Sequence, residues 1–384
     1  MNYAAPLRTE TPRPDLLTET LQSKFGSPER SSDIDLHAAT NQVLKDVGMS
    51  TADSGGKLTF YGRDPIIRSP FRFGSMAAIG LAAKAVAVAA LWRHRTGEGQ
   101  DIGVDVRKAL RRFCGFFDRK WETINGRPPL GWDPTNPFQN LPLFRETRDG
   151  RHVVALNIYP KLCAHALKFL RCDSSVESVN NAILQWRAEE LENAAAEAGL
   201  AIAMVRTFDE FRTELQYTEV LSRMPLISVE KIGESDPIPL KKDGKSPLDG
   251  VRAFGMGHVI AGAGIGRDLA CYGADVLNIW RPWDTDAEAF VWDVQVGMRS
   301  TILDYSKDDR AKFDHLLKDA DVFFANKRAG YLEHNGLDAE ELSAKKPGLI
   351  HASVVLHREP IGGYVRRLVE NAERIEPQHG SEKR

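Results

Sequence analysis

The sequence PLDGVRAFGMGHVIAGAGIG, residues 247–266, decides the fold of this chain. Its first four residues predict a turn, and the apolar run that starts at Val251 predicts a strand. The Gly/Ala-rich segment after it permits the backbone to approach another group closely. Residues 267–272 then predict a helix that ends at Gly273, and residues 275–279 predict a second strand. This order is the start of a βαβ unit, which binds ligands at the carboxyl ends of its strands.

The same alternation continues as far as residue 357. Further strands are predicted at 301–303, 321–325 and 349–356, with helices at 307–317 and 338–345. Strands and helices that alternate at this spacing predict a parallel sheet with right-handed crossovers. Residues 247–357 are therefore expected to form a Rossmann-like half.

The part of the chain before residue 247 has a different pattern. The predicted elements are a helix over 33–47, a loop over 48–56, an Ala-rich helix within 70–95, a strand over 102–106, a helix over 109–124, turns over 131–142, a hairpin over 144–156 with its turn at Asp149-Gly150, mostly helix over 161–199, a helix from Thr207, and a weak alternation over 225–240. The polar segment 241–246 is the predicted domain boundary. The expected fold class is α/β: a Rossmann-like parallel sheet, an Ala-rich helical segment and a small mixed α+β domain. The domains are a flexible 1–33, the region 34–246, the Rossmann-like 247–357 and a charged tail, 358–384.

Composition excludes several classes of function. The 384 residues are 42% hydrophobic and 27% charged, and the net charge of -2 gives no reason to expect nucleic acid or a membrane surface as a partner. The four cysteines lack the spacing of a metal site or a disulfide framework, so we expect free thiols and no metal. The apolar stretch 76–92 carries Lys84 at its centre and is better interpreted as a core helix than as a membrane span. With no signal peptide in the first residues, a cytoplasmic protein is expected.

The glycines 262, 264 and 266 do not form a dinucleotide fingerprint. A GxGxxG pattern needs a glycine at 267, where the chain has Arg267, and the second strand ends in Ile279-Trp280-Arg281 instead of an acidic residue. A nicotinamide site is therefore not expected.

Four motifs in order resemble the class III CoA-transferase family (CaiB/BaiF). The opening PLDGVR…AG…LACYGADVLNIWR is similar to the family's PLDGxxVLDxT…AGP…LADLGADVIKVE. Residues 296–304 are similar to its NxGKRS…LDL run, and residues 319–332 to its ADVFVENFRPGxL. Residues 336–338 and 347–350 continue in the family's order.

An earlier segment resembles the later half of the same family. ALWRHRTGEGQDIGVDV, residues 90–106, is similar to the family's ALxxRxxTGxGQxVDV, and residues 126–128 and the hairpin turn match the next segments of those proteins. The resemblance therefore implies a divergent member with the family's halves in swapped order, of a tandem or permuted kind.

The resemblance implies a site for coenzyme A or an acyl-CoA in the Rossmann-like half. His258, Val259 and Ile260 match the loop whose backbone contacts the adenine end, and Arg281 matches a basic residue that engages the phosphates. Asn326 and Lys327 match a pair that lines the pantetheine channel. His334 stands in the place of an arginine and Met298 in that of a lysine, with Arg299 or Arg328 as substitutes for the lost charge.

The family's catalytic aspartate lies about twenty residues before its TGxGQ motif, where it carries the acyl group as a mixed anhydride. Ser75 stands at that position in this chain, and it is also a candidate helix N-cap. Asp64 is the nearest upstream carboxylate and is interpreted as a turn residue before Pro65.

The resemblance implies an acyl-CoA:carboxylate CoA-transferase that acts on an acyl-CoA and a carboxylic acid acceptor. The alternatives are a catalytically impaired CoA-binding or interaction subunit and an acyl-CoA racemase or epimerase. The family also implies a homodimer, and the divergent catalytic position favours a role in secondary metabolism.

Overall fold

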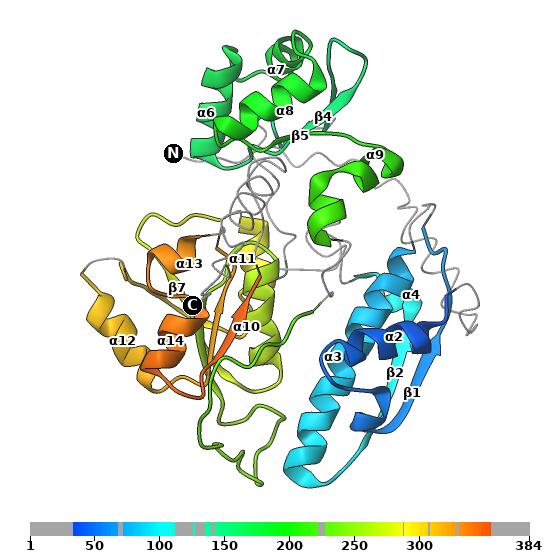
Figure 1. The fold of residues 1–384 in the computed structure, drawn as a ribbon, viewed down its shortest axis with the longest axis vertical. Coiled ribbons are helices and arrows are strands. Elements are labelled where there is room, and N and C mark those ends of the chain that lie inside the picture. Colours follow the sequence, from blue (N-terminus) through cyan, green and yellow to red (C-terminus); the bar gives the residue numbers. More distant parts are fainter. Residues whose placement is uncertain are drawn as a thin grey trace, which may run out of the picture.

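The computed structural model describes residues 34–67, 72–111, 126, 135–139, 143–221, 227–286, 288–305, 308–327 and 330–354. They form three structural modules (Figure 1). We call them the α3 module (residues 34–111), the antiparallel module (143–221) and the parallel-sheet module (248–354).

The parallel-sheet module has the topology that the alternation predicts. Its elements are β6 (Arg252–Met256), α10 (Ala261–Cys271), β7 (Asp275–Trp280), α11 (Glu288–Val294), β8 (Arg299–Ile302), α12 (Arg310–Lys318), β9 (Val322–Ala325), α13 (Tyr331–His334), α14 (Ala339–Lys345) and β10 (Ile350–Ser353). The five strands are all parallel, in the order β10-β9-β6-β7-β8. From β6 the chain adds β7 and β8 on one side, and then crosses over to add β9 and β10 on the other side of β6. The gap between the carboxyl ends of β6 and β9 is therefore the topological switch point of a doubly wound sheet.

Alternate residues of the strands supply two separate cores. Phe254, Met256 and Phe323 pack with α12 and α14 on one face, whereas Ala253 and Phe324 pack with α10 on the other. A strand buried on both faces reads as a continuous apolar run, and this is why β9 (VFFA) was predictable.

Helix α10 begins six residues earlier than expected, so the Gly/Ala-rich segment lies inside the helix and not in a loop. A Cβ atom on Gly262 would collide with the side-chain oxygen of Asn326, and one on Gly266 would collide with the sulfur of Met298. The glycines thus serve the close approach that the sequence predicted, but the partners are the ends of β9 and β8.

The α3 module contains α2 (Leu36–Lys45), the 3-10 helix η1 (Thr51–Ser54), β1 (Gly55–Tyr61), α3 (Phe73–Thr96), β2 (Gln100–Asp105) and α4 (Val106–Ala109). β1 pairs with β2 in parallel and was missed, because two glycines open it within the expected loop. Asp35 caps α2, because its side chain accepts from the backbone N–H of Ala38. Among the described helices, α3 has the length and apolar composition of a membrane-crossing helix, but alanines along it pack in a core with α2 and the two strands.

The antiparallel module contains β3 (Phe144–Glu146), β4 (His152–Ala155), α6 (Pro160–Leu170), α7 (Val176–Ile183), α8 (Ala188–Glu197), β5 (Ile202–Met204), α9 (Phe208–Thr213) and the π-helix η2 (Gln216–Leu221). The hairpin at Asp149-Gly150 is confirmed, and β4 also pairs antiparallel with β5. Thr207 begins α9 with a capping box. The helix predicted over 109–124 and most of the turns over 131–142 lie outside the described residues. Where the expected weak alternation over 225–240 is described, it forms no strand.

Candidate coenzyme A site

The candidate site lies at the switch point, between the carboxyl ends of β6 and β9. The backbone N–H of His258 donates to Asn326 Oδ1 at 2.9 Å, and Asn326 Nδ2 donates back to the carbonyl of His258 at 2.9 Å. One amide side chain therefore satisfies both backbone groups of the loop residue and fixes its orientation. Asn326 and His258 were both expected at the site from the resemblance, and the structure brings them into direct contact.

A second asparagine holds the same loop from the other side. Asn278 is fully buried on β7, accepts from Gly257 N at 2.8 Å and donates to the Gly257 carbonyl at 3.0 Å. Asn278 was not identified from the sequence, although a polar residue inside the apolar strand DVLNIW was a signal, since buried amides require partners.

Val259 continues the loop in a strained conformation. Its φ of 56° lies in the left-handed region, which a β-branched residue rarely adopts. Its N–H donates to Asp286 Oδ2 at 2.6 Å, and α10 starts two residues later without a side-chain cap. The loop thus presents the uncapped first turn of a helix, whose amides favour an anion.

Asp284 collects three basic side chains at this edge. Arg281 donates to Asp284 Oδ1 from Nη2 at 2.6 Å and from Nε at 2.9 Å, and Lys327 Nζ lies 3.9 Å from Oδ2. His258 Nε2 lies 3.3 Å from Oδ2 without the alignment of a hydrogen bond. We call His258, Arg281, Lys327 and Asp284 the cation cluster. Asp284 was not identified from the sequence, and no spacing there pointed to it.

Burial sets the ionisation of the cation cluster. Burial alone would raise the pKa of Asp284, but its contacts with His258 and Arg281 and the charge of Lys327 hold this pKa well below its ordinary value. Burial lowers the pKa of Lys327 to about 8, and Asp284 only partly offsets this effect. Perturbed groups of this kind gather at functional sites.

Aromatic side chains orient the guanidinium of Arg281. Its carbon lies 5.6 Å from the ring centre of Trp283 and 5.4 Å from that of Tyr331, and Nη1 donates to the Tyr331 hydroxyl at 2.9 Å. The Tyr331 and Tyr305 hydroxyls are 2.9 Å apart. Arg281 is thus held as a flat fork at the sheet edge, a geometry that suits phosphate groups.

Arg299, Ile260 and His334 were expected at the site and are not members of the cation cluster. Arg299 begins β8 at the opposite, amino edge of the sheet, where it pairs with Asp275 at 2.5 Å, so it does not compensate for lost charge at the site. Ile260 is exposed just before α10, and His334 is exposed at the end of α13. Met298 packs in the apolar core on the α10 face, and Arg328 lies outside the described residues.

Ser75 is not the N-cap of α3, because the helix begins at Phe73 and Arg72 is the cap. Ser75 N donates to Asp64 Oδ2 at 2.5 Å, so the carboxylate of Asp64 caps the first turn from the preceding loop. Ser75 is 1% exposed, and its hydroxyl has no hydrogen-bond partner among the described residues. No group placed there activates it as a nucleophile.

Two contacts between the α3 module and the parallel-sheet module show how far Ser75 lies from the cation cluster along the direction of the helices. Lys84 on α3 pairs with Asp268 on α10 at 3.0 Å, and Arg95 donates to the Asp249 carbonyl just before β6 at 2.8 Å. The two helices therefore run in the same direction, away from the carboxyl edge of the sheet (Figure 1). From the Lys84–Asp268 contact, Ser75 is about 14 Å and the start of α10 about 10 Å back toward that edge, at 1.5 Å per residue. Ser75 thus lies at about the level of the carboxyl edge of the sheet, where the cation cluster is.

The described residues contain no group of three or more His, Cys, Asp or Glu side chains that could hold a metal ion. Cys163, Cys172 and Cys271 are free thiols, and Cys114 lies outside the described part of the chain.

Comparison with known proteins identifies relatives that are CoA-transferases. The sequence model of CoA-transferase family III matches residues 248–359. An acyl-CoA transferase of Gibberella moniliformis is 28% identical over 184 residues, which is 45% of this chain and 32% of the relative. A succinyl-CoA:mesaconate CoA-transferase of Haloarcula hispanica is 33% identical over 136 residues, 31% of this chain and 34% of the relative.

A solved structure of a CAIB/BAIF family protein from Brucella suis is 31% identical in sequence and has a TM-score of 0.26. The match covers 28% of this chain and 33% of the chain in that structure. The chain spans about a third of the length of the curated relatives that it matches.

Proposed function

We propose that this chain, whose residues 248–359 match the model of CoA-transferase family III, binds an acyl-CoA at the switch point and moves CoA between carboxylic acids. The observation that carries the proposal is the cation cluster, which places Arg281 and Lys327 beside a loop whose backbone is fixed by Asn326. Arg281 and Lys327 are the groups for the phosphates, with the first turn of α10 beside them.

The pantetheine arm of CoA would leave the cation cluster in the direction of α3. By the resemblance Ser75 stands at the position of the acyl carrier, and it lies at about the level of the carboxyl edge of the sheet. In this proposal the Ser75 oxygen attacks the acyl carbon, the C–S bond breaks, and the hydroxyl proton passes to the departing thiolate, which leaves an acyl ester. The acceptor carboxylate then attacks the ester carbonyl and forms a mixed anhydride, while the released Ser75 oxygen takes the proton back from the CoA thiol. The thiolate attacks the acceptor carbonyl of the anhydride, which forms the new thioester and releases the donor acid as its carboxylate.

The unpartnered, buried hydroxyl of Ser75 favours a second candidate function. A hydroxyl without a base is a poor nucleophile, and the described residues place no base at Ser75 Oγ. The second candidate is therefore a CoA-binding subunit without transfer chemistry of its own. Wild-type activity would reject it, whereas activity that appears only in Ser75→Asp would support it.

The first test is titration calorimetry of the full chain with CoA and acetyl-CoA. Arg281→Ala is expected to weaken binding about tenfold or more, because it removes a charge-assisted fork. Arg299→Ala is the matched control, since Arg299 lies at the opposite edge of the sheet and its loss should change affinity by less than about twofold. Equal effects of the two substitutions would place the phosphates elsewhere.

The second test is transfer itself, with a panel of donors and acceptors that ranges from aliphatic acyl-CoAs and monocarboxylic acids to the succinyl-CoA and mesaconate in the name of the Haloarcula relative. Formation of a new thioester would support transfer, and its absence with every donor and acceptor would reject it. Deuterium exchange at the α-carbon without transfer would support a racemase instead. A cytoplasmic homodimer belongs to the same proposal, and light scattering tests the oligomeric state.

A further inference from the structure

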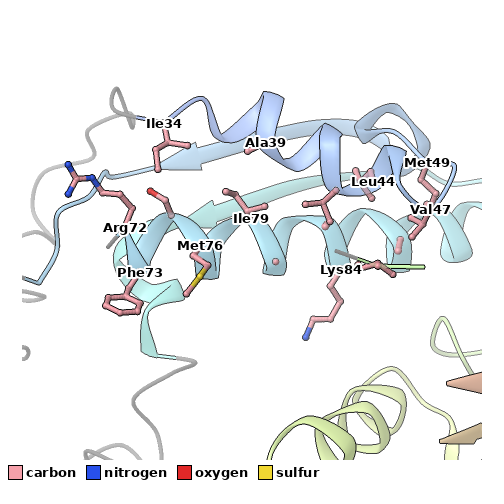
Figure 2. A pocket seen from close by; sticks show the side chains of 16 residues that line it. Ile34, Ala39, Leu44, Val47, Met49, Arg72, Phe73, Met76, Ile79 and Lys84 are labelled. Atoms are coloured by element: carbon pink, nitrogen blue, oxygen red, sulfur yellow. The ribbon is translucent and has the colours of Figure 1, made fainter. Parts of the chain in front are cut away.

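A cavity of about 670 Å³ lies between α2 and α3, apart from the cation cluster (Figure 2). Figure 2 shows Ile34, Leu44 and Val47 on one side of it and Ile79 on α3 facing them. The lining is almost entirely aliphatic, and the volume is within the range of sites that enclose small ligands.

One end of this cavity is polar. Ser75 borders it with a buried hydroxyl that has no partner among the described residues. Arg72 borders it one turn earlier, with its guanidinium directed away from the cavity (Figure 2). An unsatisfied buried hydroxyl costs about 1–3 kcal/mol, and a native protein retains such a group where something else supplies the bond. The first turn of the long helix α3 adds positive potential at the same end.

At the far end of the cavity, the charged side chain that the structure describes is neutralised by an ion pair. Lys84 also lines the cavity, but its ammonium is paired with Asp268 of α10. From Ser75 to Ala87 the cavity runs along α3 for twelve residues, which is about 18 Å at 1.5 Å per residue. The space is therefore long and apolar, with the Ser75 hydroxyl and the N-terminus of α3 at one end.

We propose that this cavity binds an aliphatic acyl chain, with the acyl oxygen at Ser75 and the first turn of α3, and with the acyl chain extended between α2 and α3 toward Ala87. This proposal specifies which acyl group the proposed transfer reaction would use. As far as it concerns binding of an acyl-CoA thioester, it rests on the proposed CoA-transferase function. A short dicarboxylate does not fit, because its second charge would be buried among aliphatic side chains without a partner.

Gly80 offers a way to block the cavity without removing a contact. It lines the cavity on α3, and a Cβ atom added to it meets no atom within 4 Å. Gly80→Leu therefore places a side chain in the cavity and also removes a helix-weakening glycine. Ala87→Leu is a second variant that narrows the far end. His94→Leu is the matched control, since His94 is exposed on the same helix and does not line the cavity.

The experiment titrates the full chain with CoA, dodecanoyl-CoA, dodecanoic acid and succinic acid. We expect dodecanoyl-CoA to bind at least about tenfold more tightly than CoA, and Gly80→Leu or Ala87→Leu to remove that difference while His94→Leu retains it. Dodecanoic acid should bind and succinic acid should not. Ser75→Ala should weaken dodecanoic acid binding about two- to tenfold.

The outcomes separate this inference from the proposed function. Binding of CoA to which the dodecanoyl chain adds nothing would overturn the acyl cavity and leave CoA transfer standing. The acyl cavity would also be overturned if Gly80→Leu and Ala87→Leu, both folded, still bound dodecanoyl-CoA more tightly than CoA. Binding of dodecanoic acid that Gly80→Leu abolishes, with no binding of CoA, would support the cavity and reject the proposed function. Binding of dodecanoyl-CoA but not of dodecanoic acid would still support the acyl cavity, provided that Gly80→Leu removes the effect of the acyl chain, and would restrict its ligand to the thioester.

Discussion

At the scale of the residue, Lys327 shows that the candidate site is built at a cost to stability. Its side chain is 10% exposed, and burial lowers its pKa to about 8. Above a pH of about 8 the folded protein releases this proton, whereas the unfolded chain retains it to about 10.5. Between these values the unfolded state binds more protons, so the free energy of unfolding rises with pH.

Lys327→Met should therefore stabilise the protein at pH 7 by about 1–3 kcal/mol and weaken CoA binding. Its stability advantage over the wild type should shrink as the pH rises from 8 toward 10. Urea unfolding at pH 7 and pH 9.5 measures both effects, with the exposed Lys241→Met as control. A pH-independent difference between Lys327→Met and the wild type would contradict the buried charge.

Asp64 is a residue whose role only the structure defines. Its carboxylate is 3% exposed and accepts the backbone N–H of Ser75 in the first turn of α3. Asp64→Ala should lower the free energy of unfolding by about 1–3 kcal/mol, because it uncaps the helix and leaves a buried donor without a partner. The exposed Asp243→Ala should change it by less than about 0.5 kcal/mol. Similar denaturation midpoints for the two variants would show that Asp64 is not a cap.

At the scale of the element, α10 depends on glycine for its position against the sheet. Gly262→Ala places a methyl group at the Asn326 side chain that holds the His258 loop, and should destabilise the protein by about 1–3 kcal/mol and weaken CoA binding. Gly80→Ala, in open space on α3, should instead stabilise by about 1 kcal/mol. Thermal unfolding of the pair measures the opposite signs, and a Gly262→Ala variant as stable as the wild type would refute close packing.

The elements were predictable where burial alone decides the sequence pattern. The strands β6, β7, β9 and β10 and the helices α3 and α14 lie where the periodicity places them. β1 and the start of α10 were not predictable, since glycine in both serves a tertiary contact that the local sequence does not contain. His258 and Asn326 were found through a resemblance, whereas Asn278 and Asp284 act through partners that only folding brings near.

At the scale of the whole molecule, one hydrogen bond joins the antiparallel module to the candidate site. The hydroxyl of Tyr159, just before α6, donates to Asp286 Oδ1 at 2.9 Å, and Asp286 Oδ2 accepts from Val259 N. Burial and the charge of Asp286 raise the pKa of this tyrosine, so it remains a donor at neutral pH. The antiparallel module thereby supports the strained loop from above the sheet edge.

Tyr159→Phe should speed hydrogen exchange of the amides at 257–260 by about fivefold, the equivalent of ~1 kcal/mol of local stability. Tyr61→Phe, at an exposed tyrosine of β1, is the control and should leave those amides unchanged. Exchange at 257–260 that does not respond to Tyr159→Phe would show that the two modules are not coupled there.

The cation cluster has a consequence for the kinetics of ligand capture. In the free protein Arg281 and Lys327 already face the carboxylates of Asp284 and Asp286, so the charges of this edge nearly cancel. A balanced surface exerts little attraction beyond the Debye length, and a polyphosphate ligand is not steered toward it from a distance. The association rate constant of CoA should therefore respond weakly to ionic strength, and ligands should differ mainly in their dissociation rate constants.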